Sequence, residues 1–187
     1  MPHHPIISHQ SPAHHTPTQA WASTKPLPSI LAALAARWAS VLPDWHYRLW
    51  DQAANAQLWR EHAPELLPVY RRYATDIERA DASRLLYLAV HGGVYADLDA
   101  VPCTRAALES VLRGTRLQLV RDPWRGSAAR KNIHHVSNFF IASVRGHPFW
   151  RFALAGLAAH QGSRGGVMHS TGPYFVVRRV GSKPRHA

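Results

Sequence analysis

The clearest pattern of apolar and polar positions lies between residues 81 and 99. Apolar residues recur at helical spacing from Asp81 to His91, and Gly92-Gly93 follows them. Because glycine readily adopts the left-handed conformation that follows a helix, this pattern predicts a helix over residues 81–91, with Asp81 as its N-terminal cap. The apolar run Val94-Tyr95-Ala96 then predicts a short strand that leads into Asp97-Leu98-Asp99.

Similar patterns predict further elements on both sides of this segment. Ser29 caps a predicted helix that ends at Val41, Asp51 caps another that reaches about Glu61, and helical structure resumes at Pro64. The first of these helices has one apolar face, which consists of Ile30, Leu31, Leu34 and Trp38. The other predicted elements are a helix over residues 147–160, with Pro148 in its first turn, and strands over residues 5–10, 47–50, 117–121, 138–143 and 174–180.

Helices and strands alternate along the chain, which indicates an α/β domain. The 187 residues are enough for one such domain with a core of its own. We divide the chain into an N-terminal segment with the first short strand (residues 1–28), a main domain (residues 29–180) and a basic tail (residues 181–187).

The chain is strongly basic, with 22 Lys and Arg residues against 11 Asp and Glu residues and a net charge of +11 at pH 7. Such an excess attracts an anionic partner, for example a nucleotide diphosphate, an acidic membrane surface or nucleic acid. The basic residues are spread along the chain and no nucleic-acid-binding motif accompanies them, so we expect no nucleic-acid partner.

The cysteine content and the N-terminal sequence indicate the cellular compartment. Cys103 is the single cysteine, which allows no intramolecular disulfide, and we expect it to be a small buried apolar residue. The N-terminus has no apolar run long enough for a signal sequence or a membrane anchor. We therefore expect a cytoplasmic protein, and contact with the inner face of the membrane stays open.

Asp97 and Asp99 are the centre of the predicted chemistry. Two carboxylates at the end of an apolar strand repel each other unless a cation neutralises them, and Mg²⁺ or Mn²⁺ prefers carboxylate, water and phosphate oxygens. Such a metal also binds a diphosphate and stabilises its charge as it leaves. Asp81 and Arg84 lie three residues apart on one helix face. They form either a local salt bridge or a pair in which Arg84 binds phosphate and Asp81 accepts sugar hydroxyls.

The run from Asp81 to Asp99 resembles the hallmark of the DXD-containing sugar transferases of glycosyltransferase family 32. That family includes yeast α-mannosyltransferases, sphingolipid mannosyltransferases and bacterial capsule or lipopolysaccharide sugar transferases. Weaker similarities extend the resemblance over residues 5–175. They lie at residues 5–10, 38–50, 138–148 and 171–173.

The resemblance implies a GT-A fold, which is an α/β architecture that binds nucleotide sugars. It also implies the metal-dependent transfer of a hexose from a UDP- or GDP-sugar to a glycan or lipid acceptor, with retention of configuration. The implied cofactor is Mn²⁺ or Mg²⁺, held by Asp99 and Asp97. The implied catalytic residues are Asp97, Asp99 and Arg84, and the implied substrate-binding residues are Asp81, Arg84, Tyr95, Asp97 and Asn138.

Other interpretations stay open. The family usually continues well beyond the segment that Thr171-Gly172-Pro173 resembles, whereas this chain ends at Ala187. We therefore also consider a truncated, catalytically impaired member that binds a nucleotide sugar without turnover. Phosphatases with an aspartate nucleophile also end a strand in Asp-x-Asp, but they usually have Thr where this chain has Val101. Core packing explains Tyr95 as well as a nucleotide contact does.

Overall fold

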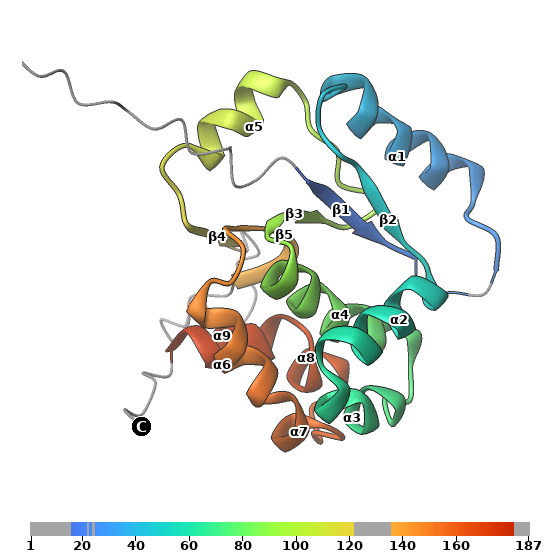
Figure 1. Cartoon of the computed structure of the whole chain (residues 1–187), viewed down its shortest axis with the longest axis vertical. Coiled ribbons are helices and arrows are strands. Elements are labelled where there is room, and N and C mark those ends of the chain that lie inside the picture. The colour runs from blue at the N-terminus through green and yellow to red at the C-terminus, as the bar shows by residue number, and fades with distance from the viewer. Residues whose placement is uncertain (1–15, 22, 24, 122–135, 182–187) are drawn as a thin grey trace, which may run out of the picture.

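The structure, a computed structural model, describes residues 16–121, apart from residues 22 and 24, and residues 136–181. A five-stranded mixed sheet runs through it, with the strand order β2-β1-β3-β5-β4 (Figure 1). The strands are β1 (Pro17–Ala20), β2 (Arg48–Trp50), β3 (Gly93–Ala96), β4 (Leu117–Arg121) and β5 (Val136–Ser143).

The sheet changes from parallel to antiparallel at β3. Strand β1 pairs in parallel with β2 and β3, and its Thr18 lies opposite Arg48 on one side and Tyr95 on the other. Strand β5 pairs antiparallel with β3, where Tyr95 lies opposite Ile141, and with β4. The end of β3, and with it the Asp-x-Asp segment, therefore lies in the middle of the sheet.

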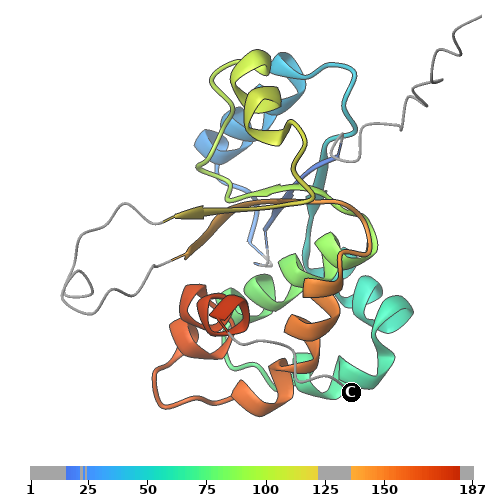
Figure 2. The same ribbon diagram turned by 90° about the vertical axis from the view of Figure 1, so that its left-hand side faces the viewer.

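Helices cover both faces of the sheet (Figures 1 and 2). One face carries α1 (Ser29–Val41) and α5 (Arg105–Leu112). The other face carries the remaining described helices, of which α4 lies against the sheet. They are α2 (Gln52–His62), the short 3-10 helix η1 (Pro64–Leu66), α3 (Leu67–Arg71), α4 (Asp76–Val90), α6 (Pro148–Ala155), α7 (Leu157–His160), α8 (Val167–Ser170) and α9 (Pro173–Gly181).

Each face of the sheet has its own core. Alternate residues of β3 point to opposite faces, so Tyr95 packs with the α4 side while Val94 and Ala96 pack with the α1 and α5 side. The larger core lies on the α4 side. Its largest fully buried side chains are Trp50, Trp59, Trp150 and Tyr87.

Helix α4 begins five residues earlier than the sequence pattern predicts. Thr75 caps it, because the Thr75 hydroxyl accepts from the Glu78 amide at 3.2 Å while the Glu78 carboxylate accepts from the Thr75 amide. The prediction that Asp81 caps the helix is therefore wrong. Asp81 lies in the second turn and is buried, so its carboxylate is available for contacts with other elements.

The structure corrects several other predictions. Residues 174–180 form helix α9 instead of a strand, because Phe175 and Val176 pack into the core while Arg178 on the same segment faces outward. Gly156 divides the predicted helix at residues 147–160 into α6 and α7. Strand β1 was not predicted, and the predicted strand at residues 5–10 lies outside the described residues.

Smaller corrections concern side chains near the chain's surface. Ile30, predicted on the apolar face of α1, is 67% exposed, and Ser29 makes no capping hydrogen bond through its side chain. Cys103 is exposed instead of buried. By contrast, Asp51 caps α2 as predicted, since its carboxylate accepts from the Ala54 amide at 2.8 Å.

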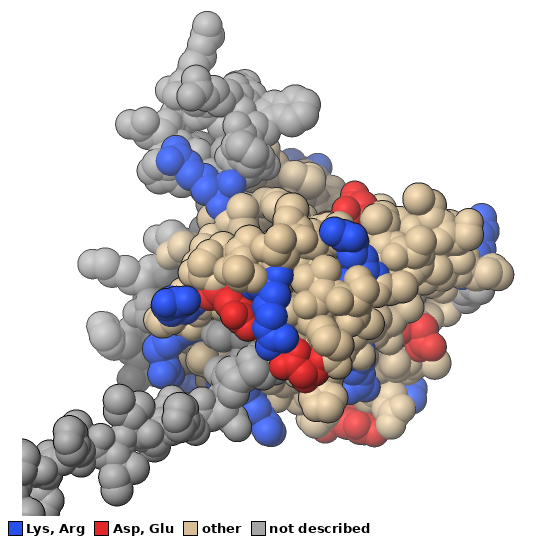
Figure 3. All heavy atoms as spheres, turned by 90° about the horizontal axis from the view of Figure 1, so that it is seen from above, with Lys and Arg blue, Asp and Glu red and all other residues tan. Residues whose placement is uncertain are grey.

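Charges of both signs are interspersed on the face that α1 and α5 cover (Figure 3). Arg105 pairs there with Asp44 at 2.5 Å and with Glu109 at 2.8 Å. A continuous basic field, which a nucleic-acid-binding surface needs, is not seen on this face. None of the helices within the described ranges has both the length and the hydrophobicity to cross a bilayer.

The turn from α4 into β3 yields a stability prediction. Gly92 has a φ of +68°, and an added Cβ would lie 2.5 Å from the amide nitrogen of Arg145. We expect Gly92→Ala to lower the free energy of unfolding by about 3 kcal/mol, because a left-handed backbone and a backbone clash add together. Gly114→Ala is the matched control: φ is +69° but no atom lies within 4 Å, so a loss of about 1 kcal/mol is expected. Urea unfolding measures the free energy of unfolding of both variants. Equal losses in Gly92→Ala and Gly114→Ala would show that the clash with Arg145 contributes nothing.

Candidate active site

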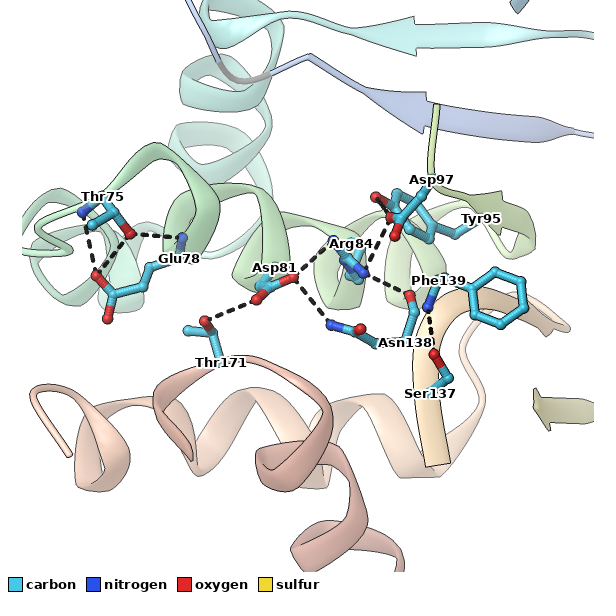
Figure 4. A network of polar contacts seen from close by, with 10 residues as sticks. All are labelled: Thr75, Glu78, Asp81, Arg84, Tyr95, Asp97, Ser137, Asn138, Phe139 and Thr171. Atoms are coloured by element: carbon cyan, nitrogen blue, oxygen red, sulfur yellow. Dashed lines mark hydrogen bonds and ion pairs between the residues drawn. The ribbon is translucent and has the colours of Figure 1, made fainter. Parts of the chain in front are cut away.

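Arg84 is the centre of a buried network of polar contacts between α4, β3 and β5 (Figure 4). Its Nη2 lies 2.7 Å from Asp81 Oδ1, and its Nη1 donates to the backbone carbonyl of Asn138 at 2.6 Å. The same Nη1 lies 3.4 Å from Asp97 Oδ1. One guanidinium therefore joins the helix to the Asp-x-Asp segment and to β5.

Asp81 is held on both carboxylate oxygens. Oδ1 accepts from Asn138 Nδ2 at 3.1 Å as well as from Arg84, and Oδ2 accepts from the Thr171 hydroxyl at 3.4 Å. Burial raises the pKa of Asp81, and the nearby charge of Arg84 opposes that rise. Both side chains are almost fully buried, with 7% and 6% of the Arg84 and Asp81 side chains exposed, so this pair orients its neighbours instead of meeting solvent.

Tyr95 supports Asp97 from the same strand. The Tyr95 hydroxyl donates to Asp97 Oδ1 at 2.8 Å, and the Arg84 guanidinium carbon lies 4.4 Å from the centre of the Tyr95 ring. Burial raises the pKa of Tyr95 well above its usual value, so the phenol stays protonated and remains a donor. Tyr95 therefore packs in the core, as one interpretation of the sequence predicted, and its hydroxyl also holds a carboxylate of the motif.

Gln19, which the sequence did not single out, holds the backbone of the motif. Its buried amide group donates from Nε2 to the carbonyl of Asp97 at 2.8 Å and to that of Ala100 at 3.3 Å. The Tyr47 hydroxyl donates to Gln19 Oε1 at 2.8 Å, and burial raises the pKa of Tyr47 to about 12. Trp38 also donates its indole N–H to the Ala100 carbonyl, at 3.1 Å. The backbone of the turn from Asp97 to Ala100 is therefore held by two neutral side-chain donors, Gln19 and Trp38.

Asp99 stands apart from this network. Its side chain is exposed, and no residue within the described ranges makes a hydrogen bond or an ion pair with it. Asp97 and Asp99 together line one side of a pocket of about 560 Å³. The rest of the lining is largely apolar and comes from α1, α5, β5 and the segment after the motif; it includes Trp38, Pro102, Leu108, Phe139 and Phe140.

The two carboxylates fit a divalent cation of the Mg²⁺ type. Asp97 keeps one oxygen, Oδ2, outside the contacts with Arg84 and Tyr95, and Asp99 has both oxygens available. Within the described residues, no group of three or more His, Cys, Asp and Glu side chains gathers to enclose a metal. Two carboxylates would leave the other coordination positions of the cation to water and diphosphate oxygens. Mg²⁺ is usually bound in this way beside phosphates.

The structure thus brings five of the six predicted site residues into direct contact. Arg84, Asp81, Asn138, Tyr95 and Asp97 form one network, and Asp99 shares the pocket with Asp97. Sequence reasoning missed Gln19 and the contact that Thr171 makes. A signal for Thr171 existed, since Thr171-Gly172-Pro173 was part of the resemblance, whereas nothing in the sequence marked Gln19.

Comparison with solved structures identifies the class of fold. The chain superposes on the structure described as PaToxG glycosyltransferase with a TM-score of 0.67 over 90% of this chain and 69% of that one, at 16% identity. At this level of identity the likeness concerns the fold alone. The predicted α/β fold of the GT-A type is confirmed.

Sequence comparisons then identify the family. Residues 28–117 match the family model for the glycosyltransferase sugar-binding region containing the DXD motif. The chain is 33% identical over 138 residues to mannosyl phosphorylinositol ceramide synthase SUR1 of Saccharomyces cerevisiae, a match that covers 72% of this chain and 33% of that protein. It is 30% identical over 180 residues to inositol phosphoceramide mannosyltransferase 3 of Schizosaccharomyces pombe, covering 92% and 46%. The chain belongs to the DXD-motif sugar transferases, as the run from Asp81 to Asp99 predicted. It spans between a third and a half of the length of these curated relatives.

The buried pair yields a prediction about pH. Removing the guanidinium with Arg84→Met leaves Asp81 buried without its countercharge, so the pKa of Asp81 rises further above its unfolded value. Such a carboxylate destabilises the fold increasingly as the pH rises above the unfolded pKa. We expect a loss of about 3–5 kcal/mol in the free energy of unfolding near neutral pH and a smaller loss at about pH 4–5. Adding Asp81→Asn should restore part of the stability. Urea unfolding at both pH values tests this, and a pH-independent loss would contradict it.

The side-chain amide of Gln19, which contacts the backbone of the motif, yields a prediction about stability. Gln19→Leu removes the donor to two carbonyls and the acceptor of Tyr47, all of which are at least partly buried. We expect a loss of about 2–4 kcal/mol, because each buried polar group without a partner is destabilising. Gln57→Leu is the control, since Gln57 makes one exposed side-chain contact with Glu61, and its effect should stay within about 0.5 kcal/mol. Thermal or urea unfolding compares them; similar small effects would show that the Gln19 contacts contribute little.

Proposed function

We propose that this protein transfers a hexose from a nucleotide-diphosphate donor to a glycan or lipid acceptor, in a metal-dependent reaction with retention of configuration. The observation that carries the proposal is the pair of carboxylates at the rim of a pocket, of which Asp97 is fixed by the buried Arg84 and Asp99 is left available. The membership of the DXD-motif sugar transferases gives this geometry its reaction class.

In this proposal Asp99 and the available oxygen of Asp97 would hold Mn²⁺ or Mg²⁺, and the metal would supply positive charge that stabilises the nucleotide diphosphate as a leaving group. The Arg84 side chain is only 7% exposed, and Asp81, Asn138 and Asp97 contact its guanidinium group. Its contribution is to hold Asp97 in place and to add a fixed positive charge beneath the site. Asp81 and Asn138 position that guanidinium. In this proposal they bind the donor sugar through the hydrogen-bonding groups that the contacts with Arg84 do not use.

The relatives supply the first donor and acceptor to test. Two of them are named as a mannosyl phosphorylinositol ceramide synthase and an inositol phosphoceramide mannosyltransferase. A mannosyl donor and an acceptor with an apolar portion are therefore the first choices. The apolar wall of the pocket beside Asp99, which includes Phe139 with 39% of its surface exposed, is consistent with an acceptor of mixed polarity.

The proposal is tested by nucleotide release from a panel of UDP- and GDP-sugars in the presence of Mn²⁺. We expect one donor to be consumed and the rate to fall by a factor of at least about 10² in Asp99→Asn, since a metal ligand supplies several kcal/mol to the departing charge. Removal of the metal with EDTA should have the same effect on the unsubstituted protein.

Glu109→Gln provides the matched control, because Glu109 is an exposed carboxylate on α5 outside the pocket, paired with Arg105. It should leave the rate unchanged. A rate in Asp99→Asn equal to that of the control would exclude the assigned role of the motif. Mn²⁺-dependent nucleotide binding with no release from any donor would favour a protein that binds nucleotide sugars without turnover.

A further inference from the structure

Two pockets adjoin on the α2 side of the molecule, away from the Asp-x-Asp motif. The smaller one has a volume of about 100 Å³ and is lined by residues of β2, α2 and the end of α4, among them Arg48, His62 and His91. The larger one has a volume of about 560 Å³ and lies between α2, η1, α4 and α6. His62 lines both, and the neighbouring residues Val90 and His91 line one each, so the two pockets lie next to each other at this point.

The small pocket gathers basic side chains without a matching set of acids. The Arg48 guanidinium carbon lies 3.5 Å from the centre of the Trp50 ring, and no carboxylate within the described residues pairs with it. The rings of His62 and His91 lie 6.1 Å apart. Burial lowers the pKa of His91, and the nearby charges of Arg48, His62 and Arg145 lower it further.

One acidic residue lines this small pocket, and its carboxylate is engaged. Glu61 Oε1 accepts from Gln57 Nε2 at 2.7 Å, while its other oxygen lies 3.9 Å from His62 Nε2. An anion that enters the pocket would therefore meet Arg48 and two imidazoles as donors. A tetrahedral phosphate group fits this set, since guanidinium and imidazole N–H groups are its usual partners.

The large pocket is lined mainly by apolar side chains. Its walls are side chains of the helices, including Leu66, Leu86, Ala89, Trp150 and Leu154. Glu65, His147 and Arg151 provide its polar part, so the apolar interior has a charged border. A volume of this size is in the range that encloses a small ligand or a portion of a chain.

The position of these pockets separates them from the candidate active site. His91 and Gly92 precede β3, whereas Asp97 follows it, so the length of the strand lies between them. Helix α4 spans the same distance, with Arg84 at the motif and Val90 at the large pocket. A ligand here would leave Asp97 and Asp99 accessible.

We propose that the two pockets together bind an anionic membrane lipid, with its phosphate at Arg48, His62 and His91 and part of an acyl chain in the groove between α2, α4 and α6. A cluster of basic groups lies here next to an apolar cavity, and a molecule that uses both needs an anionic group joined to an apolar chain. An anion alone would use only the small pocket, and a neutral apolar molecule would use only the large one. The proposal goes beyond the transferase function and does not depend on it.

The first experiment measures binding of the short-chain soluble lipid dioctanoyl phosphatidate by isothermal titration calorimetry. Inorganic phosphate and octyl glucoside serve as the separate head-group and apolar probes. We expect the lipid to bind at least about tenfold more tightly than either probe, because only the lipid fills both pockets. Equal affinity for phosphate and for the lipid would overturn the proposal, and so would equal affinity for octyl glucoside and the lipid.

Variants locate the site. Arg48→Gln should weaken lipid binding about tenfold through the loss of a charge-assisted contact, and Arg60→Gln, at an exposed position of α2 outside both pockets, should not. Ala155→Trp should block the groove, whereas Ala158→Trp, on an exposed part of α7 that lines neither pocket, should not. All four positions are on the surface, and unfolding midpoints verify that each variant folds. Unchanged binding in both Arg48→Gln and Ala155→Trp would overturn the assignment.

Vesicle flotation then tests whether the site works on a bilayer. We expect the protein to float with phosphatidylcholine vesicles that contain phosphatidic acid and not with pure phosphatidylcholine, and Ala155→Trp to reduce flotation. Flotation that depends on vesicle charge but is the same in Ala155→Trp and Ala158→Trp would reveal nonspecific attraction to the basic surface and overturn the proposal. The Asp99→Asn variant should float like the unsubstituted protein, so failure of the lipid site and failure of the transferase function are distinguishable.

Discussion

The ion pair between Arg84 and Asp81 is the interaction on which the candidate active site depends. A guanidinium and a carboxylate this deeply buried need partners for their remaining groups. Here the segment after β3, strand β5 and the segment before α9 supply partners for Nη1 of Arg84 and both oxygens of Asp81, and only Arg84 Nε has no hydrogen-bond partner among the described residues. The contacts with Asn138 and Thr171 join residues that lie 54, 57 and 90 positions apart in the chain. The pair therefore couples the packing of α4 to the position of Asp97, and a shift in any of these elements would move the motif.

The two aspartates of the motif have different environments as a result. Asp97 is shared between Arg84 and Tyr95, and its carbonyl is held by Gln19, whereas Asp99 faces the pocket and has no partner in the part of the chain that the structure describes. A fixed carboxylate next to an available one gives a metal site a defined position together with open coordination. The donors to the carbonyls of the turn, Gln19 and Trp38, are neutral, so they add no positive charge that would repel the cation.

Helix α4 connects this site to the lipid-binding pockets that we propose. It carries Asp81 and Arg84 on the turns near the motif. At its other end Val90 lines the large pocket, and His91, which follows the helix, lines the small basic one. Almost every side chain from Asp81 to Leu88 is buried, so the helix is a rigid element between the two regions. A protein bound to a membrane through the far end of α4 would leave the pocket beside Asp99 accessible from solvent.

The sequence by itself determined the elements whose signals are local. The helix at Ser29–Val41, the cap at Asp51, the glycine turn before β3 and the strand at Leu117–Arg121 follow from periodicity and turn chemistry, and the run from Asp81 to Asp99 identified the family. Only the tertiary structure decided the rest. Residues 174–180 have strand-forming side chains, yet packing of Phe175 and Val176 made them a helix. Asp81 has the residue type of a cap, but its partners Asn138 and Thr171 lie 57 and 90 residues away. The same holds for Gln19, which contacts carbonyls 78 and 81 residues away, because such contacts form only when the sheet brings those segments together.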